Sequence, residues 1–270
     1  MKTYLKGWVL IVLVFLFSFN AVANPFDNTN LSSGDAAYGS QPYRFEKNEW
    51  LLVDIKTTPE IMRALVPAPL KPNPENLIML YIGRFNIVEP EISYLEAGLI
   101  IPASIYEEKT KNEKWGGYLP ILYLDEVAPI IGGREIYGFP KQGAEIEFTR
   151  NDNLVHAIVK KDGEIIIDIN FEIKKKAELT NTESSLVSFL FKRIPSVNLK
   201  NVYEVRQITS VESANYMIDE QFLGNASLKF GSTLSDPLDQ IPVLEVVNGR
   251  FEINNFTMME GEVLHDYLQK

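Results

Sequence analysis

Alternating apolar and polar residues dominate the chain beyond residue 42 and predict a mainly β structure. Several segments rich in β-branched and aromatic residues, some of them alternating with a period of two, are typical of strands: 50–57, 77–88, 119–125, 144–150 and 201–211. The clearest hairpin covers 154–173, where Asp162 and Gly163 separate two apolar runs and favour a two-residue turn. We therefore expect a mostly antiparallel sheet.

Helical patterns are few. Thr58 and Pro59 supply a cap and a first-turn proline, and the apolar residues that follow at helical spacing end before Pro67. The segment 184–195 fits either a helix or a buried strand, and 258–270 predicts a short terminal helix. No internal repeat or low-complexity linker divides the chain. These patterns predict one barrel-like α+β domain.

The first residues follow a different pattern and predict export. Lysines precede an apolar run over 8–19, and Ala21 and Ala23 follow in the arrangement that precedes signal cleavage. The apolar run is short for a bilayer span. We predict a signal peptide over 1–23, a polar flexible leader over 24–42, release to the periplasm or the outside, and no stable membrane insertion after cleavage. The folded domain would then cover the rest of the chain, 43–270.

Composition excludes several classes of function. The 270 residues carry 26 Lys and Arg against 36 Asp and Glu, a net charge of -10, which disfavours binding to nucleic acid. The absence of cysteine excludes disulfides, thiolate catalysis and cysteine-ligated zinc. The two histidines, His156 and His265, lie in separate apolar segments and predict no metal site. No nucleophile elbow and no glycine-rich phosphate loop is present.

The stretch GREIYGFPKQ, residues 133–142, presents one lysine in an unusual setting. Pro140 favours extended backbone at Phe139, so Lys141 is displayed from a non-helical segment among aromatic and apolar neighbours. Composition alone would make Lys141 an ordinary surface lysine beside a turn. The sequence blocks around it change that interpretation.

Ordered blocks at compatible spacing carry a resemblance to a known family. They are GGYLPILYLDEVAPIIGGREIYGFPKQ (116–142), YLEAGLIIP (94–102), FKRIPSVN (191–198) and DPLDQIPVLEVV (236–247). With them the chain resembles the acetoacetate decarboxylase family over 42–268. The resemblance implies a closed β-barrel with few helices, no cofactor and a larger homo-oligomer. It also implies that Lys141 is the Schiff-base lysine and that Glu96 is the acidic residue beside the reacting centre.

Imine chemistry explains why such a site needs a lysine. A neutral amine attacks a ketone to form an iminium, which accepts the electrons of a breaking C–C bond. Acetoacetate decarboxylase is itself a standard example of an enzyme that uses a lysine in this way. At an unperturbed pKa near 10.4, only about 1 lysine in 2,500 is neutral at pH 7. We expect burial behind Phe139 and Tyr137 to favour the neutral amine of Lys141.

The chain departs from the family pattern at three positions. Gln142 stands where true decarboxylases have a second lysine, Asn48 where they have an arginine, and Tyr81 where a second glutamate is expected. Arg84 lies on the same predicted strand as Tyr81. The chain therefore keeps the Schiff-base lysine of the family but differs from it at residues expected to lie around that lysine.

These residues suggest roles within the site. We expect Glu96 to shuttle protons and Gln142, Tyr81 and Phe139 to contact the substrate. A salt bridge between Arg134 and Glu135 would brace the loop.

The function predicted is a cofactor-independent lyase that decarboxylates a short β-keto acid such as acetoacetate. Two alternatives remain open at this point. One is a Schiff-base aldolase or dehydratase acting on a keto acid. The other is an exported, non-catalytic barrel that binds a carbonyl or apolar ligand and retains Lys141 as a relic.

Overall fold

The computed structural model describes residues 41–108, 110–179 and 183–269. They belong to one compact unit, Ala36–Lys270. The predicted signal peptide and the leader up to residue 40 lie outside the described residues. No helix among the described residues is long and apolar enough to cross a membrane.

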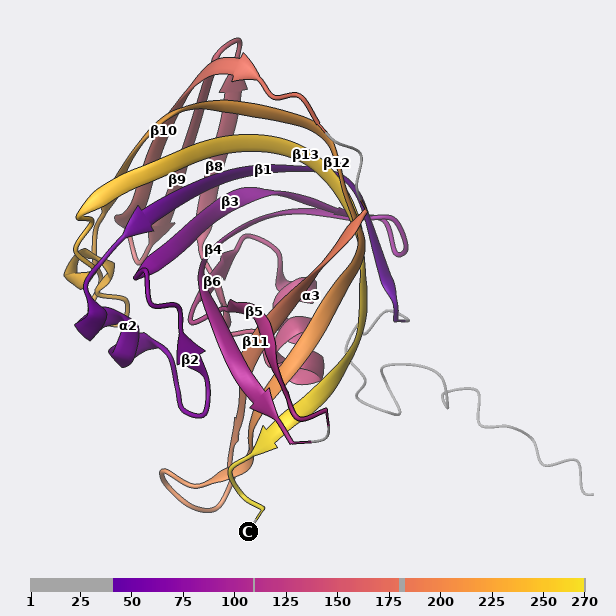
Figure 1. The fold of residues 1–270 in the computed structure, drawn as a ribbon. Coiled ribbons are helices and arrows are strands. Elements are labelled where there is room, and N and C mark those ends of the chain that lie inside the picture. The colour runs from indigo at the N-terminus through magenta and orange to yellow at the C-terminus, as the bar shows by residue number, and fades with distance from the viewer. Residues whose placement is uncertain (1–40, 109, 180–182, 270) are drawn as a thin grey trace, which may run out of the picture. The chain divides into compact units, whose positions relative to one another are not determined.

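Strands make up most of the described chain, and the helices are short (Figure 1). The strands are β1 (Tyr43–Lys56), β2 (Lys71–Pro72), β3 (Leu77–Ile87), β4 (Ile92–Glu107), β5 (Asn112–Tyr118), β6 (Leu122–Leu124), β7 (Lys141–Gly143), β8 (Glu145–Asn151), β9 (Leu154–Lys161), β10 (Glu164–Lys176), β11 (Ser184–Pro195), β12 (Tyr203–Phe230) and β13 (Glu245–Asp266). The helices are α2 (Pro59–Leu65), α3 (Val127–Gly132), the π-helix η1 (Gly133–Tyr137) and the 3-10 helix η2 (Leu238–Gln240). The prediction of a mainly β protein with few helices is confirmed.

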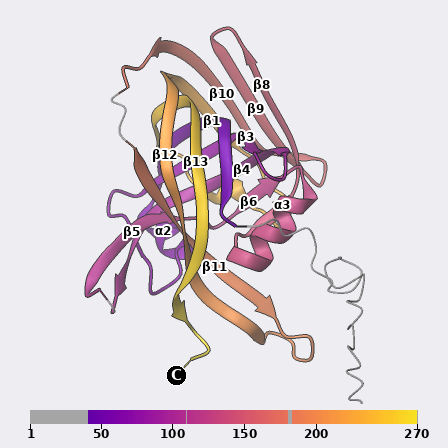
Figure 2. The same ribbon diagram turned by 90° about the vertical axis from the view of Figure 1, so that its right-hand side faces the viewer.

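The strands form one 13-stranded sheet, of which ten follow the order β11-β5-β4-β3-β1-β13-β12-β10-β9-β8. The other three lie beside this path: β2 pairs with β4, and β6 pairs with β4 and β7. Most neighbours are antiparallel, whereas β5 with β11 and β6 with β7 are parallel. In addition, β11 pairs with β12 as well as with β5. Strands β3, β1, β13 and β12 arch in the same direction (Figure 1), and α3 lies beside β6 (Figure 2).

Local sequence signals account for the clearest elements. The Thr58 side chain caps α2 by accepting a bond from the backbone N–H of Ile61 at 3.4 Å, and the helix ends before Pro67 as expected. The predicted hairpin is β9 and β10, joined through Asp162 and Gly163, whose φ angles of 52° and 84° suit a tight hairpin turn. The segment 184–195, whose sequence pattern fits either a helix or a buried strand, forms the strand β11.

Two sequence expectations need correction. The strand expected over 119–125 is shorter and consists of β6 alone. The short helix expected at the end of 258–270 is not found in the described residues, because β13 continues to Asp266 and pairs there with Gln207 of β12. The long antiparallel partner satisfies the backbone groups that a helix would otherwise pair internally.

Both faces of the sheet carry buried side chains, which form two core clusters. In β1, Leu51 and Val53 belong to one cluster, whereas Leu52 between them belongs to the other. The second cluster is rich in aromatic residues and includes Phe139. It surrounds the side chain of Lys141.

Candidate active site

Lys141 is the first residue of β7, and its side chain is buried. Only 7% of the residue is exposed. Parallel pairing with Leu122 of β6 fixes the backbone of the lysine in the sheet. Because a buried amine is stripped of water, it favours a neutral state or requires a compensating charge.

The segment just before β7 holds both the backbone and the stem of this lysine. Arg134 of η1 donates from Nη1 to the backbone oxygen of Lys141 at 3.0 Å. Gly133 lies against the aliphatic stem, where an added Cβ would be 2.7 Å from Cδ of Lys141. Only glycine leaves the room for the lysine at this point.

Glu96 of β4 faces the amine. Its Oε2 lies 3.0 Å from Nζ of Lys141, and the two side chains are 6% and 8% exposed. The hydroxyl of Tyr81 donates to Oε1 of Glu96 at 2.5 Å. One carboxylate therefore contacts both the amine and a phenol.

The pKa of Tyr81 is raised well above its usual value, mainly by burial and next by the negative charge of Glu96. The phenol thus keeps its proton at neutral pH and acts as a hydrogen-bond donor to Glu96. Since Glu96 is held by this bond, its second oxygen stays directed at Lys141.

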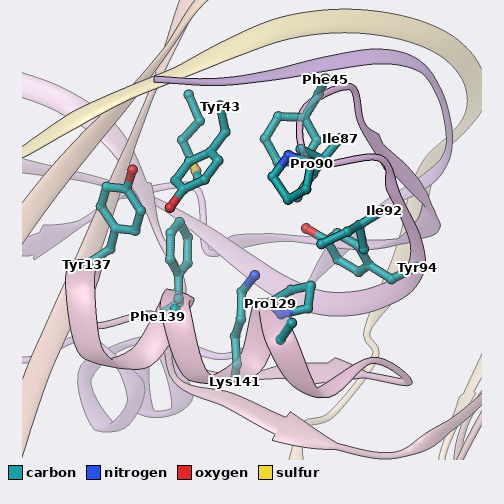
Figure 3. Close-up of a pocket in the computed structure, with 14 residues that line it drawn as sticks. Tyr43, Phe45, Ile87, Pro90, Ile92, Tyr94, Pro129, Tyr137, Phe139 and Lys141 are labelled. Atoms are coloured by element: carbon teal, nitrogen blue, oxygen red, sulfur yellow. The ribbon is translucent and has the colours of Figure 1, made fainter. Parts of the chain in front are cut away.

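Aromatic rings flank the amine on two sides. Nζ of Lys141 lies 5.1 Å from the ring centre of Phe139 and 5.5 Å from that of Tyr94. Figure 3 shows the lysine rising beside Pro129, with its nitrogen directed into the space between these two rings. The apolar neighbours predicted for the lysine are therefore present, and Tyr94 adds a ring that the sequence did not indicate.

Two cavities meet at Lys141. The smaller has a volume of about 60 Å³ and is lined by residues of α3 and η1 (Figure 3). The larger has a volume of about 550 Å³ and is also lined by Glu96, Tyr81 and Phe139. The candidate residues Lys141, Glu96, Tyr81 and Phe139 thus converge on one mainly apolar cavity, as small-molecule sites do.

Gln142 does not join them. Its amide donates to Asp236 at 3.3 Å and accepts from Lys161, and it lines neither cavity. Adjacent side chains of a strand point to opposite faces, so a lysine that enters the cavity directs the next residue away. The substrate contact predicted for Gln142 is therefore not supported.

The other sequence candidates lie around the site rather than in it. Arg134 donates a hydrogen bond to the backbone oxygen of Lys141. The salt bridge predicted between Arg134 and Glu135 stays a prediction. Arg84 is 3.6 Å from Glu49 and lines neither cavity. Asn48 is fully buried, donates to Asn254 and accepts from the backbone of Asn86, so it is part of the packing.

A buried carboxylate that sequence reasoning missed also lines the larger cavity. Glu252 of β13 is 2% exposed and accepts bonds from Tyr216, Gln221 and Asn254. In the sequence it belongs to an ordinary alternation of polar and apolar residues, RFEIN. Such alternation usually indicates a solvent face, so no local signal could have revealed its burial.

The described residues offer no group of three or more histidine, aspartate and glutamate side chains that could hold a metal ion. His156 instead lies 3.1 Å from Asp168, and His265 packs edge-on against Tyr267. At Lys141 the site presents an amine, a carboxylate and a phenol in contact with one another.

Comparison with known proteins agrees with the resemblance seen in the sequence. Residues 29–268 match the family model described as acetoacetate decarboxylase (ADC). Acetoacetate decarboxylase 1 of Mesorhizobium japonicum is 31% identical over 237 residues, which are 87% of this chain and 92% of that relative.

Solved structures share the fold. The crystal structure of acetoacetate decarboxylase (ADC) from Legionella pneumophila matches with a TM-score of 0.74 at 24% identity, covering 86% of this chain and 91% of that chain. The enduracididine biosynthesis enzyme MppR, complexed with the condensation product of pyruvate and imidazole 4-carboxaldehyde, matches with a TM-score of 0.73 at 15% identity. That match covers 86% of this chain and 93% of the other.

Proposed function

The chain belongs to the acetoacetate decarboxylase family, and from this premise we propose that it is a cofactor-independent carbon–carbon lyase. In this proposal Lys141 forms a Schiff base with the ketone of a β-keto acid, and acetoacetate is the first candidate substrate. The observation that carries the proposal is the buried amine of Lys141 beside Glu96, whose other oxygen is held by Tyr81.

The first step joins the lysine to the ketone. Glu96 takes a proton from the amine, and the neutral nitrogen adds to the carbonyl carbon to form a carbinolamine. Glu96 then returns a proton to the carbinolamine oxygen, which leaves as water and generates the iminium. Oε2 of Glu96 is 3.0 Å from Nζ, within reach of both proton transfers.

The second step releases carbon dioxide. The bond between the carboxylate carbon and the α-carbon breaks, and its electron pair moves into the iminium to give a neutral enamine. Protonation of the α-carbon regenerates an iminium, and water hydrolyses it to the product ketone and free Lys141. The apolar rings of Phe139 and Tyr94 favour this step, because charge disappears as the carboxylate and iminium are consumed.

The finer features of the family are part of the same proposal. Pairing of β11 with both β5 and β12 supports a closed barrel. The resemblance supports a homo-oligomer, and the sequence pattern of residues 1–23 supports export to the periplasm or the outside.

Borohydride trapping tests the proposal. The mature protein is incubated with acetoacetate or pyruvate, reduced, digested and analysed by mass spectrometry, while carbon dioxide release is followed in parallel. We expect a reduced adduct on Lys141 and its loss in Lys141→Arg, whereas Lys192→Arg keeps the adduct. A folded protein without any adduct would contradict the Schiff-base mechanism.

The same experiment separates the reaction types. Carbon dioxide release from acetoacetate that depends on Lys141 supports a decarboxylase. An adduct with pyruvate and no carbon dioxide release from any β-keto acid would instead support an aldolase or dehydratase.

A further inference from the structure

The two buried carboxylates of the larger cavity lie on one row across the sheet. Glu252 of β13 is the register partner of Trp50 in β1, Trp50 is the partner of Gly83 in β3, and Gly83 is the partner of Glu96 in β4. Side chains of directly opposite residues point to the same face of a sheet. Three strand spacings separate the ends of the row by roughly 14 Å along the backbone.

Trp50 forms an apolar floor between the two carboxylates. An added Cβ at Gly83 would be 2.8 Å from Cδ1 of Trp50, so the glycine allows the indole to lie along the sheet. The ring centres of Phe85 and Phe256 are 5.1 Å and 5.6 Å from that of Trp50. The cavity therefore has an apolar middle and a polar group at each end.

The charges at the two ends differ. At one end Glu96 is paired with the amine of Lys141. At the other end no basic side chain of the described part of the chain forms an ion pair with Glu252. Arg250 points to the same cavity, but its guanidinium is 2.9 Å from Asp54.

Neutral groups hold Glu252 in place. Burial, followed by the charge of Glu252, raises the pKa of Tyr216, which therefore donates as a neutral phenol. Gln221 and Asn254 donate from their amides. A carboxylate in an apolar cavity with neutral donors only is still short of a compensating charge, and a cation supplied by a ligand would stabilise it.

We propose that Glu252 binds a protonated amine at the far end of an elongated carbonyl substrate whose ketone meets Lys141. The substrate class is then a keto acid with an apolar middle and a cationic terminus. This inference rests on the proposed function, because it assumes that the ketone lies at Lys141. A cavity of about 550 Å³ has room for such a molecule, whereas a short keto acid would leave Glu252 without a cationic partner.

Matched ketones test the inference. One series consists of methyl ketones of increasing chain length that end in a dimethylamino group, which is protonated at pH 7 and cannot condense with its own carbonyl. The second series ends in an isopropyl group of nearly the same shape. Borohydride-trapped adduct on Lys141 is measured against ketone concentration, with acetone as the short reference.

For wild-type protein, we expect half-maximal trapping at about tenfold or more lower concentration for the cationic ketone of best-fitting length than for its isopropyl counterpart. In Glu252→Gln, which keeps the shape of the side chain, the two concentrations become equal. Glu245→Gln, an exposed position on the same strand, keeps the preference.

The outcomes separate the two proposals. Adducts without any preference for the cationic ketones, or a preference that survives in Glu252→Gln, overturn the assignment of Glu252 and leave the Schiff-base function standing. Absence of an adduct with every ketone, acetone included, overturns the proposed function and this inference with it. If Glu252→Gln fails to fold, the absence of a preference in the wild type still overturns the assignment.

Discussion

Nζ of Lys141 lies 3.0 Å from Oε2 of Glu96, and more than nine-tenths of each side chain is buried. This pair joins the short strand β7, next to the π-helix, to the first half of β4. In the proposed reaction the amine attacks, and the carboxylate removes and returns the protons.

Replacing Glu96 by glutamine should slow the reaction while leaving the lysine in place. Glutamine keeps the shape but cannot accept the amine proton, so we expect the rate of borohydride trapping at pH 7 to fall by about 10²- to 10⁴-fold. Glu89→Gln, at an exposed position in the turn before β4, is the control. A trapping rate equal to that of the wild type would remove Glu96 from the mechanism.

Gly133→Ala should displace the nucleophile. The new methyl group would be 2.7 Å from Cδ and 2.9 Å from Cε of Lys141, so the stem of the lysine must move. We expect trapping to slow by on the order of 10²-fold, because a small displacement of a reacting group is costly. We also expect a loss of about 1 to 3 kcal/mol in the free energy of unfolding from overpacking, measured by urea denaturation.

Gly143→Ala is the matched control for this prediction. It lies on the same short strand as the lysine, and its nearest neighbour would be Cδ1 of Ile130 at 4.0 Å, an ordinary contact. We expect normal trapping. Equal rates in both alanine variants would show that the close approach of Gly133 does not position the amine.

Gln142→Lys should affect stability rather than the nucleophile. The side chain at 142 contacts Asp236 and Lys161, so a second ammonium group would be placed beside Lys161. We expect a loss on the order of 1 kcal/mol in the free energy of unfolding and no change in the pH dependence of trapping. Gln240→Lys adds the same charge at an exposed position as a control. A shifted pH profile would show that this position tunes the reacting amine after all.

Asp236→Asn should destabilise the protein in a pH-dependent way. Burial alone would raise the pKa of Asp236, but bonds from Lys161, Ser235 and Tyr123 outweigh it and lower the pKa. At pH 7 the carboxylate is nearly inaccessible and paired with Lys161, so we expect a loss on the order of 3 kcal/mol in the free energy of unfolding.

The sign of the pH effect follows from the lowered pKa. The stabilisation by Asp236 is complete above its unfolded pKa, near 3.9, and is lost as the pH falls through the lower folded value. The unfolding free energies of wild type and Asp236→Asn should therefore converge below about pH 4. Urea denaturation at a series of pH values measures this, with the exposed Asp239→Asn as control. A constant difference down to acid pH would contradict the prediction.

Sequence patterns predicted the elements whose signals are local. The cap and proline of α2 and the turn between β9 and β10 act within a few residues, and both are found as expected. The convergence of Lys141 with Glu96 followed from the family resemblance, since no local pattern joins two residues so far apart in the chain.

Long-range pairing decided the features that sequence reasoning missed. The terminal segment is a strand because β12 is long enough to pair with it. Gln142 points away from the cavity because β7 enters the sheet with Lys141 on the inner side. Glu252 is buried because two neighbouring strands place Trp50 and Gln221 beside it.

Two residues shortly before Lys141 in the chain hold this lysine in place. Gly133 lies against its aliphatic stem, and Arg134 donates a hydrogen bond to its backbone oxygen. The nucleophile is therefore positioned by its own neighbours in the chain and by pairing with β6, whereas Glu96, Trp50 and Glu252 are positioned by the pairing of strands more distant in the sequence. If the proposed roles hold, replacements at Trp50 and Glu252 change which carbonyl compound is bound, while Lys141 and Glu96 keep their places and their chemistry.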